Sequence, residues 1–165
     1  MAGDFAAALQ QVDDAALVAV ASRSQVSTDE FGQRYDINSC YSGYQKLLAD
    51  TAVNVVYVAA PHSLHRELCI MCLEAGKAVL CEKPFTISAA QAEEVINLAR
   101  EKNLFLMEAM WTRYVPAVKK LRELLAAEAI GDVQLMVAGG AYMPDFDPEF
   151  YLFNKELGGG ILLDA

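Results

Sequence analysis

The chain has 165 residues and a net charge of −9, from 13 basic and 22 acidic residues. A surface this acidic repels nucleic acid and anionic membranes, so neither is an expected partner. Hydrophobic residues make up 55% of the chain and charged residues 21%, which is typical of a compact folded domain and excludes disorder. No apolar run reaches the ~18 residues that a membrane-spanning helix needs.

The first twenty residues contain three aspartates and no basic start, which is not the pattern of a secretory signal. We therefore expect a cytoplasmic protein in a reducing compartment. The four cysteines lie outside any Gly- or Pro-rich, disulfide-dense frame, and we expect all of them to be thiols.

Short apolar runs alternate with helical segments along most of the chain. The runs cover residues 17–21, 53–60, 78–81 and 104–107, and unbroken apolar runs of this length fit strands buried on both faces of a parallel sheet. Strands that alternate with helices indicate repeated β-α-β units with right-handed crossovers. The fold class predicted from this pattern is α/β with a Rossmann-type parallel sheet.

Local signals place the helix ends. Capping-box spacing predicts helix starts at Ser27, Ser42 and Ser88. Gly76 and Asn103 are placed to end two helices in the left-handed conformation.

Both ends of the chain depart from the usual order of a nucleotide-binding fold. Residues 5–12 predict the tail of a helix that enters the first strand, so the opening strand and its Gly-rich phosphate loop are absent. Residues 133–138 predict another strand, and the glycines at 158–160 begin a motif that the chain does not complete. We expect an incomplete NAD(P)-binding domain over residues 1–128 and the start of a C-terminal α/β domain over residues 129–165.

Ligands of open parallel sheets bind at the carboxyl ends of the strands, so these ends hold the first candidates. Ser22, Arg23 and Ser24 follow the first strand, with no acid to accept a ribose hydroxyl. The Arg23 guanidinium would pair with a 2′-phosphate, which favours NADP over NAD, although a solvated surface arginine fits the same pattern.

The next strand ends in Ala60 and Pro61, followed by His62 and His65. The turn into the helix offers free backbone amides to a phosphate or ribose. These are the only two histidines, and no third ligand follows at metal-binding spacing. We expect no metal here, and a role in stabilising the turn or at the cofactor edge.

The strongest local indication of a catalytic site follows the strand at 78–81. It consists of Glu82, Lys83 and Pro84. A lysine held between a carboxylate and a proline turn keeps a rigid position. Beside a nicotinamide it would hydrogen-bond the substrate oxygen and help to move its proton, whereas the alternative is an ordinary surface ion pair.

Two further patterns have structural explanations. Cys69 and Cys72 match C-x-x-C, but they lie inside a helix and not at its N-terminus, so core packing fits better than thiol redox chemistry. Acidic residues alternate at Asp145, Asp147 and Glu149, as they do in a calcium-binding loop. The glycine and the closing glutamate of such a loop are missing, so a solvated loop fits better.

Four blocks, taken in order, resemble the Gfo/Idh/MocA oxidoreductase family. They are residues 21–24 (ASRS), 78–84 (AVLCEKP), 107–116 (MEAMWTRYVP) and 158–164 (GGGILLD). The resemblance implies a Rossmann domain, a C-terminal α/β domain that shapes the substrate site, and a homodimer. It also implies NADP-dependent oxidation of the CH–OH group of a trans-dihydrodiol or an aldose sugar, or the reverse reduction.

The same resemblance implies roles for individual residues. Lys83 lies beside the nicotinamide and the substrate, next to Glu82, and Arg23 with its serines holds the 2′-phosphate. Trp111 and Arg113 flank the nicotinamide half of the cofactor. Asp164 belongs to the motif that contacts the substrate, and the family's proton donor follows it.

Because the phosphate loop and most of the C-terminal domain are absent, we expect this chain to have weak or no activity. The alternative function is a non-catalytic, truncated paralogue that binds or regulates an intact partner.

Overall fold

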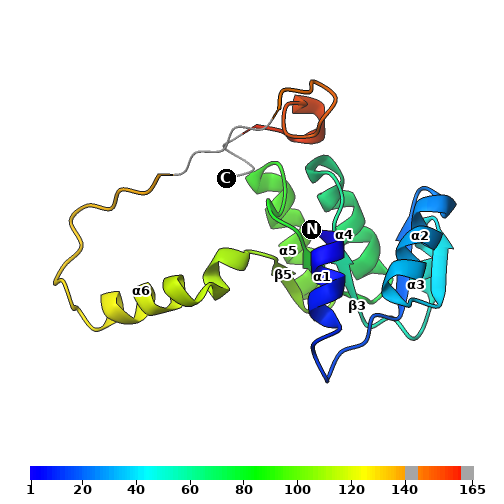
Figure 1. Cartoon of the computed structure of the whole chain (residues 1–165), viewed down its shortest axis with the longest axis horizontal. Coiled ribbons are helices and arrows are strands. Elements are labelled where there is room, and N and C mark those ends of the chain that lie inside the picture. The colour runs from blue at the N-terminus through cyan, green and yellow to red at the C-terminus, as the bar shows by residue number, and fades with distance from the viewer. Residues whose placement is uncertain (140–144, 161–165) are drawn as a thin grey trace.

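The structure is a computed structural model, and it describes residues 1–139 and 145–160. The main helices and strands alternate along the chain as the sequence predicts (Figure 1). In chain order they are α1 (Ala2–Leu9), β1 (Ala19–Ser22), α2 (Gln25–Tyr35), β2 (Ser39–Ser42), α3 (Tyr44–Ala49), β3 (Val55–Val58), η1 (His62–Leu64), α4 (His65–Glu74), β4 (Ala78–Cys81), α5 (Ala89–Glu101), β5 (Leu106–Glu108), η2 (Trp111–Tyr114), α6 (Pro116–Ala126) and η3 (Lys155–Leu157).

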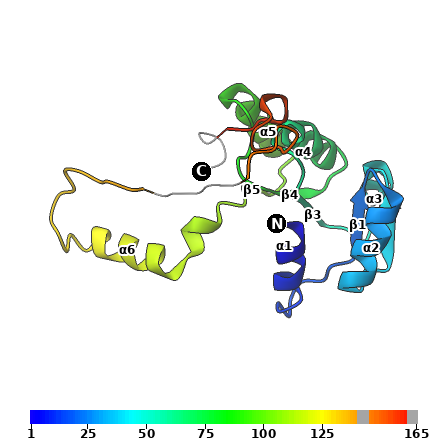
Figure 2. The ribbon, with the colours of Figure 1, turned by 45° about the horizontal axis from the view of Figure 1, so that its top comes forward.

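The strands form two parallel sheets. β1 pairs with β2, and β3, β4 and β5 form a second sheet in that order. Figure 2 shows β5, β4, β3 and β1 following one another across the molecule, with a break between β3 and β1. Among the described residues no strand occupies this break. The predicted Rossmann-type α/β fold is confirmed.

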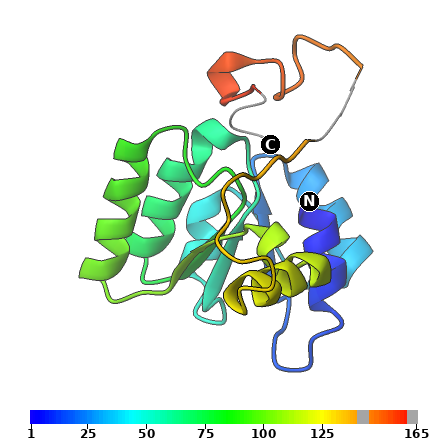
Figure 3. The same cartoon turned by 90° about the vertical axis from the view of Figure 1, so that its left-hand side faces the viewer.

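The core lies between the three-stranded sheet and helices α4 and α5. Figure 3 shows these two helices side by side against the strands. The buried cluster includes Val58, Leu73, Val79 and Val95, and three cysteines, Cys69, Cys72 and Cys81. Burying an aliphatic side chain of this size stabilises the fold by about 2 kcal/mol, which fixes β4 and its carboxyl end against the helices.

Several predicted helix ends are confirmed. Ser88 caps α5 by accepting a hydrogen bond from the Gln91 N–H at 3.4 Å. Gly76 and Asn103 have φ values of 74° and 53° and follow the ends of α4 and α5. The Lys77 N–H then reaches the Cys72 carbonyl at 2.9 Å, which closes the end of α4 in a Schellman motif.

Other local predictions are wrong. Ser24, not Ser27, caps α2, because β1 ends at Ser22 and leaves one residue for the turn. Ser42 does not start a helix: it ends β2, a strand that the sequence analysis missed, and α3 begins after Gly43. The helix whose tail was predicted at residues 5–12 covers Ala2–Leu9, so it ends three residues earlier than expected.

The strand predicted at 133–138 is absent. Val133, Leu135, Met136 and Val137 are 53–86% exposed and no strand pairs with them in the described part of the chain. A strand is stable only when a neighbouring strand accepts its backbone hydrogen bonds, so the apolar pattern alone does not form one. None of the described helices is long and apolar enough to cross a membrane.

Candidate functional site

The turn after β1 holds Arg23 between two ordered serines. The Ser22 hydroxyl accepts from the Ser24 N–H at 3.1 Å and lies 2.7 Å from the Thr28 hydroxyl. The Ser24 hydroxyl accepts from the Ser27 N–H at 3.3 Å and so caps α2, whose first turn contains no acid. Arg23 is exposed and makes no ion pair with any described residue. Its guanidinium and the helix N-terminus together present positive charge to solvent.

Both histidines are buried in the turn after β3. The two His65 ring nitrogens each lie 2.8 Å from a backbone carbonyl oxygen, one from Ala60 and the other from Pro84. His62 Nδ1 lies 3.0 Å from the carbonyl oxygen of Gly158. His65 therefore connects the end of β3 with the turn after β4. His62 connects the segment after β3 with the C-terminal segment at Gly158. These contacts agree with the expected turn-stabilising role.

The turn after β4 is held from several sides. Glu82 is only 8% exposed: one carboxylate oxygen accepts from the Lys83 N–H at 3.0 Å, and the other accepts from the Tyr57 hydroxyl. Burial raises the pKa of Tyr57 above its ordinary value, and the hydrogen bond to Glu82 raises it further. Just beyond, the Phe85 N–H donates to Glu108 Oε1 at 2.8 Å. The backbone on both sides of half-buried Lys83 is thus fixed to β3 and β5.

Sequence reasoning missed Tyr57 and Glu108 as parts of this arrangement. Glu108 had a signal, since it lies at the carboxyl end of β5 inside a block that carries the family resemblance. Tyr57 had none, because its contact joins residues 25 positions apart.

The predicted residues after β5 lie on the surface. Trp111 is 55% exposed, and Arg113 is also exposed, in the short helix η2. Asp164, the predicted substrate contact, lies outside the described residues.

One groove brings several of the predicted residues together. It has a volume of about 1180 Å³ and is lined by Ser22, Arg23, Ser24, Ala60 and Pro61. The carboxyl ends of β1 and β3 therefore face one space, as expected for a ligand of an open parallel sheet. Glu82 is hydrogen-bonded to one lining residue, Tyr57, and His65 contacts the carbonyl oxygens of Pro84 and of another lining residue, Ala60.

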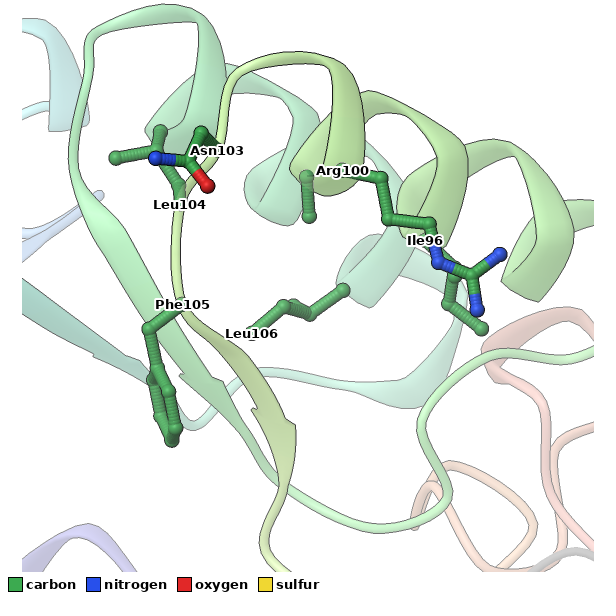
Figure 4. A pocket seen from close by; sticks show the side chains of 7 residues that line it. Ile96, Arg100, Asn103, Leu104, Phe105 and Leu106 are labelled. Carbon is green, nitrogen blue, oxygen red and sulfur yellow. The ribbon is translucent and has the colours of Figure 1, made fainter.

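A second hollow is a poorer candidate. It has about 560 Å³ and lies between α5 and the amino end of β5, where Ile96, Arg100, Phe105 and Leu106 line it (Figure 4). Ligands of parallel sheets bind at the opposite, carboxyl ends of the strands.

The cysteines do not form a reactive site. Cys69, Cys72 and Cys81 are at most 4% exposed, and burial raises the pKa of the Cys72 thiol to about 12. A hydrogen bond with Cys69, together with burial, raises the pKa of Cys81 as well. The Cys72 and Cys81 thiols therefore resist forming the thiolate that redox chemistry needs. The described residues include no group of three side chains that could hold a metal ion.

Comparison with known proteins identifies the family. Residues 1–110 match the model of the Gfo/Idh/MocA oxidoreductase family with an NAD-binding Rossmann fold. The chain belongs to this family.

Two curated relatives are named dehydrogenases. Trans-1,2-dihydrobenzene-1,2-diol dehydrogenase from Xenopus tropicalis is 41% identical over 170 residues, which cover 99% of this chain and 50% of the relative. D-xylose 1-dehydrogenase (NADP(+)) from Hypocrea jecorina is 44% identical over 160 residues, which cover 90% of this chain and 41% of the relative. The chain spans about half the length of the curated relatives it matches.

A solved structure of this family supports the same fold. A 3-ketoreductase from Actinomadura kijaniata, in complex with TDP-benzene and NADP, has a TM-score of 0.71 and 35% sequence identity. The match covers 77% of this chain and 40% of that one. The fold and the oxidoreductase family are thereby shown, while the homodimer, the cytoplasmic location and the individual site residues stay predictions.

Proposed function

We propose that residues 1–128 form the NADP-binding part of a dehydrogenase and that residues 129–165 begin its substrate domain. The proposed reaction oxidises a CH–OH group of a trans-dihydrodiol or an aldose sugar, or reduces the corresponding carbonyl. The relatives that are named for these substrates support the proposal. The observation that carries it is the exposed Arg23 turn in the same groove as the turn after β3.

The residues present fit the phosphate of NADP. The exposed Arg23 guanidinium offers paired donors, which match the oxygens of a phosphate. Ser24 adds a hydroxyl at the N-terminus of α2, where the helix dipole favours an anion. No carboxylate lies in this turn to repel a 2′-phosphate or to bind the ribose hydroxyls of NAD.

The residues around Lys83 fit a role in moving a proton. A nicotinamide ring, when bound, supplies the acceptor or donor of hydride. The Lys83 ammonium would donate a hydrogen bond to the substrate oxygen and hold the hydroxyl proton as it leaves or arrives. Because Glu82, His65 and Glu108 fix the backbone around Lys83, the side chain starts from a defined position.

The cofactor part of the proposal is tested by thermal unfolding with NADPH and, separately, with NADH. A ligand at one hundred times its Kd stabilises the fold by about 2.7 kcal/mol. We expect NADPH to raise the Tm, NADH to raise it less, and Arg23→Ala to remove most of the difference. The matched control is Arg34→Ala, at the far end of the same helix. Equal shifts with both nucleotides, or an unaffected Arg23→Ala variant, would contradict the assignment of Arg23.

The catalytic part is tested by steady-state turnover with trans-1,2-dihydrobenzene-1,2-diol and with D-xylose, in a version of the chain that is extended at both ends to the length of its relatives. We expect Lys83→Met to lower kcat/KM by ~10²-fold or more, the usual contribution of a positioned proton-transfer group. The control is Lys102→Met, whose ammonium pairs with Glu74 on the surface. A near-normal kcat/KM of Lys83→Met in the extended chain would contradict the role of Lys83, and no turnover of either substrate by the extended chain would contradict the dehydrogenase.

A further inference from the structure

Tyr57 and Glu82 lie on the same face of the three-stranded sheet. Val58 of β3 is opposite Cys81 of β4 in the strand register, and both side chains belong to the buried core. Successive side chains of a strand point to opposite faces, so Tyr57 and Glu82, each next to one of these core residues, point away from the core. The Glu82 N–H donates to the Val58 carbonyl oxygen at 2.9 Å, which keeps Glu82 beside β3. The tyrosine and the carboxylate are therefore neighbours on adjacent strands.

A chain of hydrogen bonds runs from Tyr57 to the backbone of Lys83. The Tyr57 hydroxyl donates to one carboxylate oxygen of Glu82, and the other oxygen accepts from the Lys83 N–H at 3.0 Å. Glu82 is only 8% exposed, so its carboxylate depends on protein donors more than on water. Burial and the hydrogen bond to Glu82 both raise the pKa of Tyr57, so the hydroxyl keeps its proton and remains a donor.

The Tyr57 hydroxyl decides how the Glu82 carboxylate is oriented. Without it, the buried carboxylate would keep one hydrogen-bond donor among the described residues, the N–H of the next residue in the chain. A contact between adjacent residues fixes few torsions, and a buried charge with too few donors turns toward others. The backbone at Lys83 would then lose its connection to β3.

We propose that Tyr57 is a positioning residue for Lys83 and acts through Glu82, an assignment that rests on the proposed function of Lys83. The hydroxyl fixes the turn after β4, which carries Lys83, relative to β3, which leads to the turn at Ala60 and Pro61. A small misplacement of a reacting group lowers the rate of the chemical step far more than it weakens binding. Loss of the hydroxyl should therefore lower kcat and leave the KM for NADP⁺ unchanged.

A second tyrosine makes the same kind of chain away from the turn after β4, and it provides the control. The Tyr41 hydroxyl donates to one carboxylate oxygen of Asp50 at 3.1 Å, and the other oxygen accepts from the Ala52 N–H at 2.9 Å. Tyr41 belongs to β2, in the other sheet. Tyr57→Phe and Tyr41→Phe remove the same hydroxyl and keep the aromatic ring, including the stacking of residue 57 on Phe5 at 3.9 Å between ring centroids.

The first readout is steady-state turnover of the extended chain with the same two substrates. We expect Tyr57→Phe to lower kcat about tenfold at an unchanged KM for NADP⁺, and Tyr41→Phe to leave kcat unchanged, while both lower the Tm to a similar extent. Glu82→Gln offers one acceptor oxygen to two donors, so we expect a loss of similar size. Because both changes break the same chain, the double variant should lose no more than either single variant.

The second readout is hydrogen exchange of single backbone amides, followed by NMR, in the chain of 165 residues. It needs neither cofactor nor turnover. We expect Tyr57→Phe to speed exchange of the Lys83 N–H about tenfold, and Tyr41→Phe to speed exchange of the Ala52 N–H instead.

The outcomes separate this proposal from the proposed dehydrogenase. Unchanged exchange at Lys83, a normal kcat of Tyr57→Phe beside an active parent, equal losses of kcat in Tyr57→Phe and Tyr41→Phe, or multiplied losses in the double variant would each overturn the role of Tyr57. An extended parent chain without turnover would contradict the dehydrogenase itself.

Discussion

Replacing His65 with alanine is the sharpest test of how the candidate site is held together. The side chain is fully buried, and its two ring nitrogens contact the carbonyl oxygens of Ala60 and Pro84 at 2.8 Å each. Both partners are acceptors, and a ring with one N–H donates to one of them, so losing the ring removes a hydrogen bond with a net value of about 1 kcal/mol. The cavity left by the ring adds about 2 kcal/mol, for a total loss of about 3 kcal/mol.

The measurement is urea unfolding followed by circular dichroism. With an m-value of about 2 kcal/mol/M, the midpoint of His65→Ala should fall by about 1.5 M. The next residue gives the control, because Arg66 pairs with Glu94 on the surface, where the two side chains are 39% and 47% exposed. Arg66→Ala should leave the urea midpoint almost unchanged, because water screens an exposed ion pair.

His65→Gln separates the hydrogen bonds from the packing. Its amide donates to one of the two carbonyls and fills much of the space, so we expect a loss between those of the wild type and His65→Ala. If His65→Ala destabilises the protein no more than Arg66→Ala, the ring does not hold the turn. The placement of Lys83 would then need another explanation.

Three further outcomes follow from the structure. Burial raises the pKa of the Cys72 thiol from 9.0 to about 12, so the folded protein keeps this thiol protonated where the unfolded chain loses the proton. The free energy of unfolding should therefore be highest below pH 9 and fall as the pH rises toward 12. Cys72→Ala should flatten that fall in urea unfolding measured at several pH values. Maleimide should label Cys40 in the native protein and reach the three buried thiols only after unfolding. Gly158→Ala should strain the contact with His62, because φ is +81° and a Cβ would meet the Cβ of His62 at 2.9 Å. We expect faster limited proteolysis of residues 145–160 and an unchanged urea midpoint for unfolding of the whole protein.

Local signals in the sequence were enough for the parts of the fold that neighbouring residues determine. Gly76 and Asn103 end their helices because a left-handed residue closes the last turn whatever the rest of the fold does. β4 was predicted at its observed bounds because it is an unbroken apolar run, although only Val79 and Cys81 on one face are fully buried. β2 was missed because Ser39–Ser42 is short and rich in polar residues, as a strand at the edge of a sheet can be.

The contacts that build the candidate site could not be predicted in the same way. They join Tyr57 to Glu82, His65 to Pro84 and Phe85 to Glu108, which are 19 to 25 positions apart. The sequence predicts that these strand ends meet at one edge of a sheet, but not which side chains pair there. The segment at 133–138 shows the opposite failure, since a strand pattern without a neighbouring strand remains unpaired.

The candidate site and the groove between the sheets depend on the same strand, β3. Its carboxyl end leads to Ala60, which His65 binds together with the carbonyl of Pro84. Its free edge forms one wall of the groove that also contains the Arg23 turn. A nucleotide that contacts both turns would therefore bind only when β1 and β3 are ordered together, so NADPH should slow hydrogen exchange of the β3 amides. Equal exchange with and without NADPH would show that the two turns do not share this ligand.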